Sequence, residues 1–312
     1  MDQSIHAASP ATSSSVVAVS DELVAPVGDD MELCYQTFGD SDDDPLLLVM
    51  GLGGPMNWWD AELCELLAER GFYVVRYDNR DTGRSSRGKG RVTRAMLVSA
   101  FAGRRVTVPY SLTALADDAF GLMDHLGLDS AHVVGVSMGG MIAQTMAIRQ
   151  PTRVRSLTSI MSTTGRRTVG WQHPSLLPNL LAKRGGREVY IDSTVVVFNR
   201  IGSPGFPQSE ERVRARAAET WERGISSSGV LRQMLAVITQ PNRGPRLRAL
   251  RMPALVVHGL ADKMVHVSGG RATAAAIPGA ELLLIAGMGH DLPPALFDTF
   301  ASAVRRTADR AR

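Results

Sequence analysis

This chain of 312 residues has few cysteines, and it lacks long hydrophobic runs and a large net charge. Its two cysteines, Cys34 and Cys64, have no partner residues at metal-site spacing, so buried free thiols are expected rather than a disulfide. No apolar stretch approaches the roughly 20 residues that a membrane-spanning helix needs. These absences argue against a disulfide-rich secreted fold, a cysteine metal centre and an integral membrane protein.

Charge is close to balanced, with 34 Lys and Arg residues against 31 Asp and Glu residues. Basic residues are scattered and acidic ones lie among them, which favours a solvated surface over a nucleic-acid-binding patch. Residues 1–20 are small and polar, and they lack the basic start and apolar core of a secretory signal. We therefore expect a disordered N-terminal arm and a cytoplasmic protein that binds no nucleic acid and has no membrane span. The sequence leaves open whether the chain forms a homodimer.

Short runs of apolar and β-branched residues alternate with segments of helical periodicity. Strands are expected at 22–27, 31–38, 45–50, 72–78, 131–136, 154–161, 254–259 and 280–285. Helices are expected at 60–70, 112–127, 138–149, 270–276 and 294–306. Such alternation predicts an α/β fold whose mostly parallel sheet carries helices on both faces.

One segment interrupts this rhythm. Residues 165–245 show no convincing alternation of strands and helices and are rich in Arg, Gly and Ser. Helical segments are expected there at 176–183, 210–223 and 229–237. The pattern predicts a helical cap, residues 165–245, inserted into a core that is formed by residues 21–164 and 246–312.

A glycine-flanked serine follows one of the expected strands. The stretch GVSMG, residues 135–139, matches the pattern Gly-x-Ser-x-Gly between a strand and a helix. A sharp strand-to-helix turn lifts the hydroxyl of Ser137 above the sheet, and only small residues two positions away let the chain pass itself there. The pattern alone is weak, because a chain of this composition would contain it about 0.2 times by chance.

Serine becomes a nucleophile when a histidine takes its proton and a carboxylate orients that histidine. His290 fits this role because it lies in a glycine-rich turn after the last expected strand, where side chains reach over the carboxyl edge of a sheet. His266 is the reserve candidate. Asp262, just past the strand 254–259, is the expected carboxylate, whereas Asp291 points the wrong way to hold the ring of its own neighbour.

An acyl-transfer site also needs N–H groups that stabilise the oxyanion of the tetrahedral intermediate. The amide of Met138, directly after the serine and at the positive end of a helix, is one expected donor. The second is expected in the glycine-rich loop GLGGPMNWW, residues 51–59, where the Leu52 N–H is the first choice and Gly53 the second.

Large side chains of the expected cap and of the oxyanion loop are candidates for the substrate pocket, although core packing explains each of them as well. The candidates are Gly53, Trp58, Trp59, Trp171, Tyr190 and Phe198. Few charges occur in the oxyanion and serine loops, which favours a neutral, apolar small-molecule ester as the partner. Basic cap residues that could instead meet an acidic substrate, though exposure is the commoner explanation, are Arg166, Arg167, Arg184 and Arg187.

With these residues assembled, the chain resembles the α/β-hydrolase superfamily over most of its length. GVSMGG resembles the nucleophile elbow, HGLADKMV the acid loop and GMGHDLP the histidine loop. YDNRDTGRSS, residues 77–86, resembles the family's turn after the strand preceding the first long helix, so Asp78, Arg80 and Gly83 are expected to be structural. The motifs are most similar to the esterase group that contains aclacinomycin methylesterase, and the elbow is also similar to that of enol-lactone hydrolases. One departure is Met50-Gly51 where the superfamily usually has His-Gly.

The resemblance implies hydrolysis of a carboxylic ester through an acyl-enzyme, without a metal or another cofactor. A lactonase, thioesterase, C–C bond hydrolase or cofactor-free perhydrolase would use the same three residues, and the sequence does not separate them. Haloalkane dehalogenases and epoxide hydrolases are disfavoured because their nucleophile is aspartate where this chain has Ser137. A non-catalytic ligand receptor with a hydrolase fold is a more distant alternative.

Overall fold

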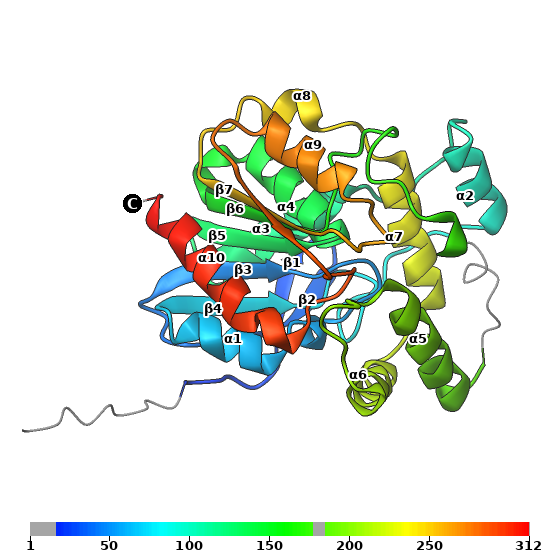
Figure 1. Ribbon diagram of the computed structural model, residues 1–312, viewed down its shortest axis with the longest axis horizontal. Helices are drawn as coiled ribbons and strands as arrows, with labels where there is room; N and C mark the ends of the chain where they lie inside the picture. The colour runs from blue at the N-terminus through cyan, green and yellow to red at the C-terminus, as the bar shows by residue number, and fades with distance from the viewer. Residues whose placement is uncertain (1–16, 177–184, 312) are drawn as a thin grey trace, which may run out of the picture.

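Within the described residues, 17–176 and 185–311, the computed structural model has one eight-stranded sheet at its centre. The strands lie in the order β1-β2-β4-β3-β5-β6-β7-β8 (Figure 1). Their bounds are β1 Leu23–Gly28, β2 Met31–Phe38, β3 Asp44–Val49, β4 Phe72–Tyr77, β5 Ala131–Val136, β6 Val154–Ile160, β7 Ala254–Gly259 and β8 Glu281–Ile285.

Strand direction decides where the loops gather. β2 runs antiparallel to both β1 and β4, and the other neighbouring pairs are parallel. β1 and β2 are joined by a tight turn in which Gly28, Asp29 and Asp30 have positive φ angles, which glycine and aspartate tolerate better than most residues. The parallel strands from β3 to β8 therefore end at one edge of the sheet, where active-site loops of α/β proteins collect.

Helices cover both faces of the sheet (Figure 1). Leu46 and Leu48 of β3 pack on the side of two helices, and Leu47 and Val49 pack on the opposite side, because successive side chains of a strand alternate between faces. The first side carries α1 (Ala61–Ala68) and α10 (Phe297–Asp309), and the second carries α3 (Leu112–His125), α4 (Met138–Arg149) and α9 (Ser268–Ala276).

A group of inserted helices lies between β6 and β7 along the chain. They are α5 (Arg187–Ile201), α6 (Glu210–Glu222), α7 (Ser227–Thr239) and the short α8 (Gly244–Leu247). Figure 1 shows α5, α6 and α7 beyond one end of the sheet, with α2 (Arg94–Phe101) on the outer side of α7. No helix in the described part of the chain is long and apolar enough to cross a membrane.

The expected strands and core helices are confirmed to within a few residues, but some helices were not expected and the N-terminal arm is shorter than expected. Helices α2 and α5 were not expected; α5 is rich in β-branched residues, which lower helix propensity, and its packing against α6 outweighs that preference. The arm does not extend to residue 20, because Val19 pairs with Phe38 beside β2. The helix expected at 176–183 falls outside the described residues apart from Leu176, and so does Arg184.

Both cysteines are free and buried, as the sequence indicates. Burial, followed by the charges of Asp78 and Glu22, raises the pKa of Cys34 to about 12. Burial also raises the pKa of Cys64 to about 12. Neither side chain therefore supplies a thiolate near neutral pH.

A buried ion pair fastens α7 to the loop after β4. Arg232 donates from Nε and Nη2 to the two carboxylate oxygens of Asp81, at 2.8 and 2.5 Å, and the Tyr110 hydroxyl donates to the same carboxylate at 2.6 Å. Burial alone would raise the pKa of Asp81, but the hydrogen bonds from Arg232, Tyr110 and the Gly88 amide lower it below its ordinary value. Removing the arginine leaves a buried carboxylate without its counter-charge.

Arg232→Met is expected to lower the free energy of unfolding by about 3 kcal/mol, measured by urea denaturation near neutral pH. Because the folded-state pKa of Asp81 is depressed, the pair stabilises fully above the unfolded-state value of about 4 and loses its effect as the pH falls through the folded-state value. The difference between wild type and variant should therefore shrink in acid.

Arg149→Met is the matched control, because it removes an exposed pair with Asp117. Its unfolding free energy should stay within about 0.5 kcal/mol of the wild type. Equal losses in the two variants would contradict the anchoring role of Arg232.

Candidate active site

Ser137 occupies the turn between β5 and α4 with a strained backbone. Its φ of 56° and ψ of −117° lie outside the regions open to most L residues. The flanking glycines are required, because a Cβ at Gly135 would lie 2.2 Å from the carbonyl oxygen of Gly139, and a Cβ at Gly139 would lie 2.0 Å from that of Val49. The Ser137 N–H donates to the carbonyl of Ile160 at 2.9 Å, so β6 helps to hold the turn.

The His290 ring lies between Ser137 and Asp262. Its Nε2 is 3.0 Å from the Ser137 hydroxyl oxygen, and its Nδ1 is 2.7 Å from Oδ2 of Asp262. The three residues follow β5, β7 and β8, so three strand ends at one edge of the sheet bring them together. In this arrangement Nδ1 donates its proton to the carboxylate, which leaves the lone pair of Nε2 to accept the hydroxyl proton.

Asp262 is held as a carboxylate by its own loop and by two histidines. Oδ1 accepts the backbone N–H groups of Met264 and Val265 at 2.8 and 2.9 Å. Burial alone would raise the pKa of Asp262, but the charge of protonated His290 and hydrogen bonds from His258, His290 and Val265 hold it well below its usual range. The carboxylate therefore stays ionised throughout the range in which histidine titrates.

His258 is a second imidazole on this carboxylate, which the sequence analysis did not indicate. It is fully buried, and its Nε2 lies 2.8 Å from the carbonyl oxygen of Val265 and 3.4 Å from Oδ2 of Asp262. Because both neighbours are acceptors, Nε2 carries the proton. Its place four residues before Asp262, at the end of a buried strand, is the signal that could have indicated this contact.

The oxyanion loop lies directly against the serine. A Cβ on Gly51 would be 3.2 Å from the Cβ of Ser137. The Leu52 N–H has no hydrogen-bond partner among the described residues. Met138 begins α4, where the first N–H groups of a helix lack intrahelical partners. Two amides next to the serine thus remain available to an oxyanion.

Gly53, the second choice for the oxyanion donor, has its amide occupied. Its N–H donates to Oε1 of Gln233 in α7 at 2.8 Å, so this amide is not free to bind an oxyanion. Gln233 is fully buried, and its Nε2 donates to the carbonyl of Arg80 and to the Thr82 hydroxyl at 2.8 and 2.9 Å. Sequence reasoning missed Gln233, because nothing near it in the chain marks a contact with residues so distant in sequence.

The histidine loop is held by the segment that follows α5. The His290 N–H donates to the carbonyl of Ile201 at 2.7 Å, and the Gly289 N–H donates to the Ser203 hydroxyl at 2.9 Å. That hydroxyl donates to Asp291, which also accepts from Nε2 of Gln208 at 2.7 Å. Asp291 therefore holds the Ser203 hydroxyl that binds the loop backbone, and it does not orient the His290 imidazole, as its position in the sequence indicates.

Trp58 and Trp59, both expected at the entrance, have different environments. The indole N–H of Trp58 donates to the Thr220 hydroxyl at 2.9 Å, and its ring meets Phe198 edge to face with centroids 6.0 Å apart. Trp59 is 1% exposed and belongs to the core on the α1 and α10 side of the sheet. The structure gives no support for the expectation that Trp59 contacts substrate, because its side chain leaves the oxyanion loop and packs in that core.

The remaining aromatic candidates lie in or beside the inserted helices. Tyr190 packs against Trp221, with ring centroids 5.7 Å apart. Trp171 is 47% exposed and stacks on His266, with centroids 4.2 Å apart. Nδ1 of His266 lies 2.9 Å from the Ser268 hydroxyl, so the reserve histidine contacts Ser268 rather than Ser137.

The residues after β4 that were expected to be structural make structural contacts. The Asp78 carboxylate accepts the Arg84 N–H at 2.9 Å and the Arg223 guanidinium at 2.7 Å. Gly83 has a φ of 51°, and a Cβ there would lie 2.1 Å from that carboxylate. Arg80 forms a two-point ion pair with Asp118 of α3.

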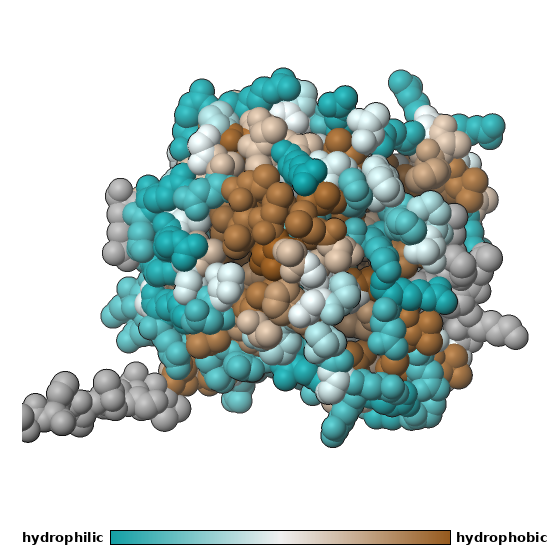
Figure 2. Space-filling model, viewed as in Figure 1, coloured by the Kyte–Doolittle hydropathy of each residue, from teal (hydrophilic) through white to brown (hydrophobic). Residues whose placement is uncertain are grey.

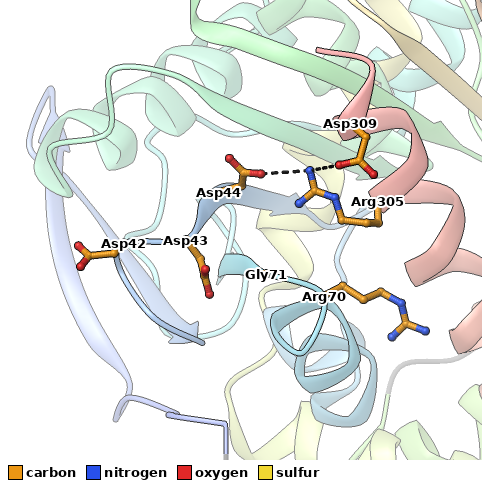
Figure 3. A pocket seen from close by; sticks show the side chains of 7 residues that line it. All are labelled: Asp42, Asp43, Asp44, Arg70, Gly71, Arg305 and Asp309. Atoms are coloured by element: carbon orange, nitrogen blue, oxygen red, sulfur yellow. Dashed lines mark ion pairs between the residues drawn. The ribbon is translucent and has the colours of Figure 1, made fainter. Parts of the chain in front are cut away.

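A pocket of about 400 Å³ lies at the opposite end of the sheet (Figure 3). Arg305 of α10 stands between Asp44, the first residue of β3, and Asp309, at 3.0 and 2.9 Å. Arg305 thus neutralises part of the acidic lining of this pocket, which lies far from the carboxyl ends of the strands. No group of three or more His, Cys, Asp and Glu side chains in residues 17–176 and 185–311 is placed to hold a metal ion.

Comparison with known proteins agrees with this geometry. The family model described as "alpha/beta hydrolase fold" matches residues 44–293. The chain belongs to the α/β-hydrolase family. Among solved structures, the enol-lactonase of Burkholderia xenovorans LB400 superposes with a TM-score of 0.71 at 24% identity, covering 92% of this chain and all of that one. A meta-cleavage product hydrolase of Pseudomonas fluorescens IP01 gives 0.72 at 19% identity, covering 94% and 99% of the two chains. At these identities the likeness concerns the fold.

Curated relatives of this α/β-hydrolase are similar over most of their length. The rhodomycin D methylesterase of Streptomyces sp. strain C5 is 29% identical over 88% of this chain and 94% of its own. The 3-oxoadipate enol-lactonase 2 of Acinetobacter baylyi is 24% identical over 78% of this chain and 80% of its own. One of these relatives is named for an ester and the other for a lactone.

Proposed function

We propose that this α/β-hydrolase is a serine carboxylic-ester hydrolase that works through an acyl-enzyme. The observation that carries the proposal is the single imidazole of His290, hydrogen-bonded at one nitrogen to a buried carboxylate and at the other to a serine on a strained turn. A neutral serine is a weak nucleophile, and this arrangement is the one that activates it.

The reaction follows from the positions of the donors and acceptors. His290 takes the proton of Ser137 as the hydroxyl oxygen attacks the ester carbonyl, and Asp262 stabilises the imidazolium that forms. The Leu52 and Met138 amides bind the oxyanion of the tetrahedral intermediate. His290 then protonates the departing alcohol, and a water molecule repeats the sequence on the acyl-enzyme, which releases the acid and regenerates Ser137.

A neutral ester of small to medium size is the proposed substrate, and the methylesterase relative supports a small alcohol part. We propose that residues 165–245 act as the cap over the site, since α7 contacts the oxyanion loop and the segment after α5 contacts the histidine loop. Trp58 and Phe198, which meet edge to face, are proposed to lie on the substrate path. Hydrolysis of a lactone by the same residues is the second candidate, supported by the enol-lactonase relative.

Ser137→Ala is expected to lower kcat on p-nitrophenyl and methyl esters by on the order of 10⁶-fold, because the acyl-enzyme can no longer form. The measurement is initial-rate kinetics on an ester series, run beside a lactone and an acyl-CoA thioester. Ser302→Ala on α10 is the control and should retain wild-type kcat. Near-normal ester hydrolysis by the Ser137 variant would refute the assignment, and faster turnover of the lactone or thioester would redirect the substrate class.

Gln233→Leu is expected to lower kcat by about 10- to 100-fold while KM changes little, because a displaced oxyanion loop stabilises the transition state less well. Loss of the bond to Gly53 is the physical cause. The measurement is kcat and KM on a soluble p-nitrophenyl ester, with the thermal midpoint as a check on folding. Gln150→Leu, at the far end of α4, is the matched control. If the Gln233 variant changed only KM, or lost no more kcat than the control, a positioning role would be ruled out.

A further inference from the structure

The segment around α2 forms a basic surface that the proposed hydrolysis does not use. Residues 87–108 contain six basic residues and no acidic one, which corrects the expectation that basic residues are scattered throughout the chain. All six are exposed: Arg87, Lys89, Arg91, Arg94, Arg104 and Arg105. We call residues 87–108 the α2 surface.

These cations lack carboxylate partners among the described residues. No ion pair involves any of the six, whereas arginines elsewhere on the surface, such as Arg149 and Arg310, lie against a carboxylate. The charge is extended by Arg167, which is exposed and donates to the carbonyl of Ala100 in α2 at 2.9 Å. An exposed block of one sign without internal neutralisation attracts a polyanionic partner.

The α2 surface also exposes large apolar side chains. Val98 is 69% exposed and Phe101 is 77% exposed, three residues apart on one face of the helix. The opposite face is buried, since Ala100 packs with Leu235 of α7 in a small satellite core. In Figure 2 brown residues lie beside teal ones at the upper right, the position of α2 in Figure 1.

Basic side chains flank this apolar face along the helix. Arg94 lies four residues before Val98 on the same side of α2, and Arg104 and Arg105 follow soon after the helix ends at Phe101. The apolar face stays exposed although the opposite side of α2 packs against α7. The exposure is therefore a feature of a packed helix and not of a frayed segment. Exposed apolar groups ringed by cations match the chemistry of an interfacial helix.

We propose that the α2 surface docks on an anionic phospholipid membrane, with Val98 and Phe101 entering the headgroup region and the cations contacting lipid phosphates. A membrane offers a partner to both kinds of side chain, since the acyl-chain boundary accepts the apolar groups and the anionic headgroups pair with the cations. A nucleic acid would satisfy the cations but would leave Val98 in water, so the exposed apolar pair favours lipid. Docking is a property of this surface and does not depend on the chemistry at Ser137.

Co-sedimentation of the full chain with vesicles tests the proposal. Vesicles of phosphatidylcholine and phosphatidylglycerol in equal parts should bind the protein, vesicles of phosphatidylcholine alone should bind it far less, and added salt should weaken binding to the anionic vesicles. Absence of binding to the anionic vesicles at low salt would overturn the proposal.

Two variants separate the contributions of charge and apolar contact. The triple variant Arg94→Glu, Arg104→Glu and Arg105→Glu should bind anionic vesicles at least about 100-fold more weakly, since each cation removed costs about five-fold and each new carboxylate adds repulsion. The double variant Val98→Ser and Phe101→Ser should bind about ten-fold more weakly at unchanged net charge. Circular dichroism and the thermal midpoint check that both variants fold.

A second basic segment supplies the matched control. Arg246, Arg248 and Arg271 are exposed without carboxylate partners, and the large exposed hydrophobic residues from 226 to 281 are limited to Leu260. Changing these three to Glu alters net charge equally and should weaken vesicle binding by less than about three-fold. Equal losses in the two triple variants would overturn the proposal. So would vesicle binding unaffected by the Val98 and Phe101 changes together with salt-dependent binding of duplex DNA, which would assign the α2 surface to nucleic acid.

Discussion

Two hydrogen bonds to one imidazole constrain more of this structure than any other interaction. His290 meets the Ser137 hydroxyl at 3.0 Å and the Asp262 carboxylate at 2.7 Å, and neither distance tolerates a shift of an ångström. The three residues come from the ends of β5, β7 and β8, so the order of the parallel strands and the length of each following loop must agree. The sheet therefore supplies the rigidity that places three loop residues against one another.

The loops themselves are stabilised from the opposite side by the inserted helices. Gln233 of α7 binds the amide of Gly53 in the oxyanion loop, and Ser203, after α5, binds the amide of Gly289 in the histidine loop. α7 is in turn fastened by the buried pair of Arg232 and Asp81. A substitution in these helices can thus alter the reacting geometry without touching substrate, in addition to any effect on the pocket.

Local patterns in the sequence predicted the parts of this structure that local physics determines. Strands 131–136 and 254–259 follow from runs of β-branched residues. The turn at Ser137 follows from its two flanking glycines, because a Cβ at either position would clash with a nearby backbone carbonyl. Contacts between distant segments carry no such signal, which is why Gln233 was missed, whereas the spacing of His258 and Asp262 is a local signal that was overlooked. Trp59 was misplaced because two adjacent tryptophans look alike in sequence, although the 3₁₀ turn at Met56–Trp58 sends only one of them into the core. α5 was missed because helix packing outweighed the preference of its β-branched residues.

Labelling with a fluorophosphonate, followed by peptide mapping in a mass spectrometer, tests the central claim most directly. The reagent reacts with a serine only where a neighbouring base removes the proton and nearby amide N–H groups donate hydrogen bonds to the phosphoryl oxygen. The account predicts one phosphonylated peptide, modified at Ser137, whose formation is abolished in His290→Ala and preserved in His266→Ala. Absence of an adduct in the folded wild type, or an adduct on Ser137 that forms equally fast without the His290 imidazole, would contradict it.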